Sequence, residues 1–172
     1  MRRADGRRAT GIAAPAIIAV AVAALDQASK LLILRRLRPG RAIPAIAGFF
    51  NLTLVHNQGT AFGLFYRHGI VFIFLSLATI AALALFYRRL LALGANARWS
   101  AGLILGGAAG NLIDRVFRGA VVDFLDFYLT WGGEEYHWPA FNLADSVICV
   151  GVGLLLITVA FKHPQEQITI SK

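Results

Sequence analysis

The chain has 172 residues, of which 58% are hydrophobic and only 15% are charged. A soluble domain of this length is rarely so apolar, so the composition excludes that class and indicates an integral membrane protein. The net charge of +8 does not indicate nucleic-acid binding, because the basic residues lie between long apolar segments.

Four segments reach the roughly 20 apolar residues that a helix needs to cross a bilayer. They cover residues 11–34, 69–87, 99–117 and 141–161. The third is rich in glycine, which suits close packing inside a helix bundle. We therefore expect an all-α integral membrane protein with four transmembrane helices, forming a single domain over residues 1–172.

The basic residues predict the orientation of these helices. With four spans, most of them fall on the side that the positive-inside rule makes cytoplasmic, so both termini are expected inside. A second cluster falls outside, against the rule, and we interpret it as a surface segment facing lipid headgroups. The inner group is Arg2, Arg3, Arg7, Arg8, Arg88, Arg89, Arg98, Lys162 and Lys172, and the outer cluster is Arg35, Arg36, Arg38 and Arg41.

Two long connections lie on the outer side. In the first, residues 48–55 have the β-branched and aromatic character of short strands, and residues 57–59 form a turn. The second, residues 118–140, combines acids with Trp131, Tyr136 and Trp138. Such aromatic residues prefer the membrane–water interface.

Five of the nine acidic residues lie inside or beside apolar segments. A carboxylate there costs roughly 2.5–3.5 kcal/mol, so it needs a function or a partner. At about 1.5 Å of rise per residue, two of them lie roughly 22 Å beyond the inner ends of their helices. The unusual acids therefore converge in depth near the outer face. The five are Asp26, Asp114, Asp123, Asp126 and Asp145.

Asp123 and Asp145 flank the second outer connection. Two carboxylates held close together share a proton, so one can act as general base and the other as general acid. Such a pair can activate water against a peptide carbonyl without a metal. Two structural alternatives stay open: Asp145 as a first-turn acid behind an Asn142 N-cap, and Asp123 as a solvated interfacial acid.

Other polar residues share helix faces. Asn111 lies three and four residues before Asp114 and Arg115, and Arg115 could hold a substrate carbonyl or phosphate or neutralise Asp114. Asp26 and Lys30 have the spacing of an intrahelical ion pair. The spacing of the four histidines fits no metal site, and we expect no cofactor.

Five segments of the chain resemble those of the lipoprotein signal peptidase (signal peptidase II) family of bacterial aspartyl membrane proteases. They occur in the family's order, and together they are specific. The segments are LDQASK (25–30), NQGTAFG (57–63), GGAAGNLIDR (106–115), VVDFL (121–125) and FNLADS (141–146).

The resemblance implies roles for individual residues. Asp123 and Asp145 would be the catalytic pair. Residues that orient the substrate would be Asn57, Asn111, Arg115 and Asn142, and the supporting residues would be Asp26, Lys30 and Asp114. Ala109 and the stretch of residues 130–135 depart from the family pattern, the latter by lengthening the connection where a lid over the site is expected.

The resemblance also implies a substrate and a location. The substrate would be a membrane-bound prolipoprotein with diacylglycerol on its cysteine, cut immediately before that cysteine. The enzyme would be a monomer in the bacterial inner membrane, in contact with phospholipid but not nucleic acid. Its active site would lie near the outer face, beside a small extracytoplasmic β cradle.

Two rival functions remain at the level of sequence. One is a small cation- or proton-coupled transporter that uses Asp26, Asp114 and Asp145 as intramembrane carriers. The other is a structural subunit in which the acids only pair with Arg115 and Lys30. The predicted depth of the acids near one face disfavours the transporter, which needs acids near the midplane.

Overall fold

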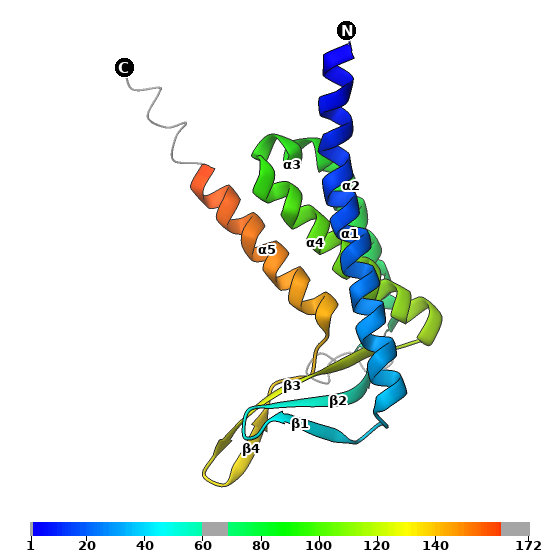
Figure 1. The fold of residues 1–172 in the computed structure, drawn as a ribbon, viewed down its shortest axis with the longest axis vertical. Helices are drawn as coiled ribbons and strands as arrows, with labels where there is room; N and C mark the ends of the chain where they lie inside the picture. The colour runs from blue at the N-terminus through cyan, green and yellow to red at the C-terminus, as the bar shows by residue number, and fades with distance from the viewer. Residues whose placement is uncertain (1, 60–68, 163–172) are drawn as a thin grey trace.

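The computed structural model describes residues 2–59 and 69–162, and residues 60–63 of the NQGTAFG segment and Lys172 lie outside this range. The described chain forms a helical bundle that stands on a small antiparallel sheet (Figure 1). The first turn of α1 and the last turn of α5 lie at the end opposite the sheet. The helices are α1 (Arg2–Arg36), α2 (Gly69–Leu85), α3 (Tyr87–Leu93), α4 (Ala95–Arg118) and α5 (Leu143–Lys162). The strands are β1 (Ala42–Ile46), β2 (Phe50–Asn57), β3 (Val121–Trp131) and β4 (Glu134–His137).

The helices support the assignment to the class of integral membrane proteins. They support two or three of the four predicted transmembrane helices. In the described chain, two helical segments, Ala13–Arg36 and Leu143–Phe161, are long and apolar enough to cross a membrane. The second predicted span is divided into α2 and α3, which bend by 63° and could together form a third. The third predicted span is helical as α4, but it does not pass the same test of length and composition.

Helix α4 is the centre of the bundle and packs against α1, α2, α3 and α5. Its glycines permit this packing, as the sequence predicted. A Cβ atom on Gly106 would lie 2.7 Å from the Ala19 carbonyl oxygen, and one on Gly107 would lie 2.6 Å from the Ala144 carbonyl oxygen. Helix α4 can therefore be more polar than a lipid-facing helix, because its neighbours are protein.

Replacing Gly106 with alanine is expected to destabilise the bundle. The added methyl group would collide with α1, and overpacking of this kind typically costs about 1–3 kcal/mol. Gly153→Ala is the matched control, since a Cβ there meets nothing within 4 Å and alanine is favoured over glycine in a helix by about 0.5–1 kcal/mol. Thermal unfolding in detergent measures both. Equal melting temperatures would contradict the close contact between α1 and α4.

The four strands lie in the order β1-β2-β3-β4, and all neighbours are antiparallel. Strand β2 covers most of the segment predicted to have strand character. The second outer connection, residues 118–140, contains a hairpin of β3 and β4 that was not predicted from the sequence. The sequence of β3 is otherwise rich in β-branched and aromatic residues, but its acidic residues interrupt the pattern that would predict a strand.

One face of β3 packs on the end of α1. Val122 and Phe124 are buried there with Ile33 and Leu37 of α1 and Leu54 of β2. Because successive strand residues point to opposite faces, this packing directs Asp123 to the other side.

The outer arginine cluster is exposed and lies where α1 leads into β1. Arg35 and Arg36 end α1, and Arg38 and Arg41 lie in the turn that leads into β1. Together with the start of β1, this turn lines a cavity of about 490 Å³.

Candidate active site

Asp123 and Asp145 come together around Asn142. Asp123 lies on β3 and Asp145 in the first turn of α5. The side-chain amide of Asn142 donates to Asp123 Oδ1 at 2.7 Å, and its backbone N–H lies 3.4 Å from Asp145 Oδ2. Both carboxylates therefore lie within 3.4 Å of a polar atom of one residue, Asn142.

Asn142 also caps α5. Its side-chain oxygen accepts from the Asp145 backbone N–H at 2.9 Å, while the Asp145 carboxylate faces the Asn142 N–H. This reciprocal arrangement is that of a capping box. The structural alternative for Asp145 is thus correct, and it is compatible with a chemical role because the cap fixes the carboxylate beside Asp123.

Asp123 is buried, with a relative exposure of 2%, so the alternative of a solvated interfacial acid was wrong. Burial raises the pKa of Asp123 to about 7, and the nearby charge of Asp145 acts in the same direction. Hydrogen bonds from Asn57, at 2.9 Å, and from Asn142 oppose this shift of the pKa without cancelling it. A carboxyl group with this pKa can hold a proton near neutral pH.

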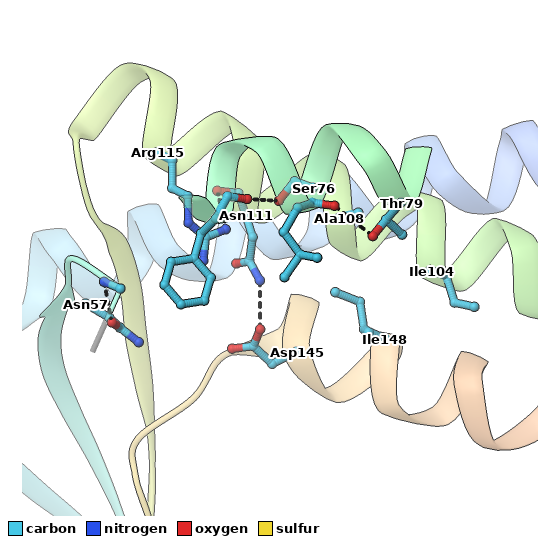
Figure 2. Close-up of a pocket in the computed structure, with 12 residues that line it drawn as sticks. Asn57, Ser76, Thr79, Ile104, Ala108, Asn111, Arg115, Asp145 and Ile148 are labelled. Atoms are coloured by element: carbon cyan, nitrogen blue, oxygen red, sulfur yellow. Dashed lines mark hydrogen bonds between the residues drawn. The ribbon is translucent and has the colours of Figure 1, made fainter. Parts of the chain in front are cut away.

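Asn111 is held so that its amide faces Asp145. Its side-chain oxygen accepts from Lys30 Nζ at 3.0 Å and from Asn142 Nδ2 at 3.2 Å. The amide nitrogen is thereby directed to Asp145 Oδ1, to which it donates at 2.7 Å (Figure 2). Lys30 therefore acts on Asp145 through Asn111.

Lys30 is the centre of a buried charge cluster. Its ammonium group lies 2.8 Å from Asp26 and 2.9 Å from Asp114, and all three side chains are fully buried. The second oxygen of Asp26 accepts from the Ala144 backbone N–H at 3.0 Å, and Asp114 accepts from the Val122 N–H at 3.1 Å. The cluster thus joins α1 and α4 to the elements that carry Asp123 and Asp145.

Arg115 does not neutralise Asp114, contrary to one of the predicted alternatives. Lys30 and Arg118 pair with Asp114 instead. The Arg115 guanidinium lies 5.2 Å from the centre of the Phe72 ring, at the wall of a cavity of about 310 Å³.

This cavity lies between α2, α4 and α5. One part is polar, where Asn57, Asn111, Arg115 and Asp145 gather, and the other is mostly apolar (Figure 2). The apolar part is lined by Leu75, Ile104, Ala108 and Ile148, with Ser76 and Thr79 from α2. A cavity of this composition can hold an apolar chain with a polar backbone group next to Asp145.

Two partners of the cluster were missed in the sequence. Arg118 pairs with Asp114 from four residues away, and this spacing was a usable signal. Gln27 donates to Asp114 at 3.0 Å and to the Gly110 carbonyl at 3.1 Å, and accepts from Arg118 at 2.8 Å. Nothing in the spacing of Gln27 pointed to these contacts, since they join α1 to α4.

The fold and the site describe an integral membrane protein with paired carboxylates where the helices meet the sheet. The model of the family described as Signal peptidase (SPase) II matches residues 18–161. The chain therefore belongs to the signal peptidase II family, as the five segments predicted. It is a member of a family of membrane proteases.

Named relatives agree with this assignment. The chain is 49% identical over 145 residues to the lipoprotein signal peptidase of Syntrophotalea carbinolica, covering 82% of this chain and 87% of the relative. It is 46% identical to that of Geobacter metallireducens over 137 residues, covering 77% and 82%. A solved bacterial membrane enzyme, determined by the in meso method, has a TM-score of 0.73 at 31% identity, covering 89% of this chain and 91% of its own.

Proposed function

We propose that this protein is an aspartic endopeptidase that removes the signal peptide from prolipoproteins, cutting immediately before a diacylglyceryl-modified cysteine. The proposal rests on one observation. Asp123 and Asp145 both contact Asn142, and Asp145 lines the adjacent cavity. The names of the similar proteins support the substrate class. No cofactor is needed in this scheme.

The geometry suggests a role for each acid. Asp123, with its raised pKa, holds the proton. Asp145 accepts from Asn111 and faces the Asn142 N–H, so its carboxylate is held in a fixed position beside Asp123 and acts as the base. Asp145 takes a proton from water while the water oxygen bonds to the scissile carbonyl carbon, and Asp123 gives its proton to the carbonyl oxygen. The proton on Asp145 then passes to the leaving nitrogen as the C–N bond breaks, and Asp123 regains its proton from the tetrahedral hydroxyl.

We also propose the location predicted from the sequence: a monomer with four spans in the bacterial inner membrane, both termini in the cytoplasm and the site near the outer face. Helix α3, which carries Arg88 and Arg89, lies at the end of the bundle opposite the sheet (Figure 1). The positive-inside rule makes that end cytoplasmic. The transporter alternative lacks support, because Asp26 and Asp114 are both bound to Lys30.

The rate is expected to fall as the pH rises through about 7. The reaction needs one proton on the pair, and Asp123, whose pKa is raised to about 7, loses it above that value. Both carboxylates are then charged and neither can act as the acid. A profile of kcat/KM against pH should show this alkaline limb with unit slope. A flat profile up to about pH 9 would rule out Asp123 as the acid.

Reconstituted protein tests the substrate. The purified chain in liposomes is mixed with a diacylglyceryl-modified prolipoprotein, or with the same precursor lacking the lipid, and the products are identified by mass spectrometry. We expect cleavage of the lipidated precursor only, at the bond before the cysteine. Equal cleavage of both precursors, or of neither, would reject the proposed substrate.

A further inference from the structure

A second cavity, of about 210 Å³, lies between α1, α2 and α4, and its lining is almost entirely apolar. The cavity opens at the surface of the bundle, because an alanine on each of its two side walls is exposed. Helix α4 forms the floor, and α1 and α2 form the walls. The lining residues used below are Pro15, Ala16, Leu83, Ala84, Ala101 and Leu105.

The cavity exists because α1 and α2 both pack on α4 but not closely on each other. Among the described elements, α2 packs closely only on α4 and α3. The floor is low, since Ala101 has only a methyl group to fill the space. An apolar cavity of about 150 Å³ already binds benzene. The larger cavity between α1 and α2 can therefore hold a segment of a hydrocarbon chain.

This cavity is distinct from the candidate active site. Thr79 lines the active-site cavity and the next residue, Ile80, lines the second one, so α2 is a wall between the two. Consecutive residues of a helix differ by about 100° in direction. Ala101, on the floor, lies ten residues before Asn111 on α4, or roughly 15 Å farther from the sheet.

A cationic side chain lies at the end of this cavity. Arg98, Ala101 and Leu105 have the spacing i, i+3 and i+7, so they share one face of α4, with Arg98 nearest the end opposite the sheet. Tyr87, which also lines the cavity, lies within the electrostatic range of Arg98. Arg98 is half-buried, and among the described side chains no acid forms a salt bridge with it. The apolar cavity thus ends at a cation that has no anionic partner in the described chain.

We propose that this cavity binds an acyl chain of an anionic phospholipid whose phosphate contacts Arg98 and Tyr87. The lipid comes from the leaflet at the end of the bundle opposite the sheet, where α3 lies (Figure 1). A guanidinium group donates several hydrogen bonds to one phosphate, and a tyrosine hydroxyl can donate another. Basic pockets between transmembrane helices are known sites for anionic headgroups. The apolar lining and the cation together therefore match the two parts of this ligand.

The consequence is support for α2 from the side opposite the active-site cavity. A bound acyl chain fills the space between α1 and α2, which otherwise make few contacts with each other. A ligand that binds the folded state raises its stability by mass action. Added anionic phospholipid should therefore raise the melting temperature of the protein.

Native mass spectrometry of the full chain tests the proposal. Delipidated protein in detergent is titrated with phosphatidylglycerol or with phosphatidylcholine that has the same acyl chains. We expect one phosphatidylglycerol molecule to bind more tightly than phosphatidylcholine, and to raise the melting temperature more. Neither measurement involves cleavage, so the result does not depend on the proposed peptidase activity.

Arg98→Gln tests the headgroup contact. Removing one arginine beside an anionic headgroup should weaken binding of phosphatidylglycerol about fivefold and leave binding of phosphatidylcholine unchanged. Arg89→Gln is the matched control, because it removes the same charge from α3. The Arg89 guanidinium lies over the Phe86 ring, at 5.6 Å from the ring centre, and Arg89 is about 200° around the helix from Tyr87. We expect the control to bind both lipids as the unaltered protein does.

Ala84→Phe tests the cavity itself. The added ring fills the space from an exposed position of the α2 wall, so binding of both lipids should weaken at least tenfold. Ala82→Phe adds the same ring to another exposed position of α2, about 200° around the helix, and should bind lipid normally. Circular dichroism checks that both variants are folded, and Arg98→Gln carries the test if Ala84→Phe does not fold.

Four results would overturn the proposal. Equal affinity for the two lipids would mean that no headgroup is recognised. Equal effects of Arg98→Gln and Arg89→Gln would reduce the preference to net charge. Equal effects of Ala84→Phe and Ala82→Phe would place the lipid outside the cavity. Dimers that lose bound lipid as they form would assign the space between α1 and α2 to a second copy of the chain.

Discussion

Asp123→Asn and Asp145→Asn are each expected to abolish prolipoprotein cleavage while the protein still folds and inserts. Each change replaces the general acid or the general base with an amide that cannot transfer a proton in this way. The expected loss of cleavage rate is on the order of 10³-fold or more. The double variant should be about as impaired as either single variant, because residues that act as a unit are not additive. Product formation from a lipidated precursor in liposomes measures all three.

Asp126→Asn is the matched control for this series. Asp126 is a buried acid on the same strand, with 8% relative exposure, but its partners are Asn51, at 3.1 Å, and His137, at 2.8 Å. It has no contact with Asn142 among the described hydrogen bonds. We expect Asp126→Asn to keep most of its activity. Normal processing by Asp123→Asn or by Asp145→Asn would refute the assigned pair.

Lys30→Met is expected to destabilise the protein strongly. It leaves Asp26 without its buried cation and Asp114 with Arg118 alone. Removing one partner of a buried ion pair typically costs about 3–5 kcal/mol. Activity should also fall, because the Asn111 amide loses the donor that directs it to Asp145. Thermal unfolding in detergent and a cleavage assay record the two effects.

Two further variants separate charge from packing. Arg118 is 25% exposed, so Arg118→Met should cost less than Lys30→Met, since solvent weakens such pairs. Adding Asp26→Asn to Lys30→Met should restore part of the lost stability by removing an orphaned carboxylate. An unchanged melting temperature for Lys30→Met would mean that the buried cluster does not hold the helices together.

The helical part of the fold was predictable because its signal is local. Apolar segments of sufficient length predicted α1 and α5, and the glycines of α4 predicted a tightly packed central helix. The hairpin of β3 and β4 was missed because Asp123 and Asp126 interrupt an apolar alternation. Those acids contact Asn57, Asn142, Asn51 and His137, which are distant in sequence or beyond a turn.

The convergence of the acidic residues was predictable, but the contacts between them were not. Helix rise and topology predicted that the acidic residues lie at a common depth. The resemblance of the motifs then selected Asp123 and Asp145. The bridging role of Asn142 required the meeting of β3 with the start of α5, which no local pattern encodes. The same holds for Lys30, which has the spacing of a simple ion pair with Asp26 but also reaches Asp114 and Asn111.

One structure would test the central claim directly. A lipidated peptide in which a hydroxyl-bearing tetrahedral group replaces the scissile amide mimics the attacked carbonyl. In its complex with this protein, we expect the hydroxyl to lie at hydrogen-bond distance, about 2.6–3.2 Å, from both Asp123 and Asp145. A hydroxyl that contacts neither side chain, or only one of them, would contradict a paired-carboxylate mechanism.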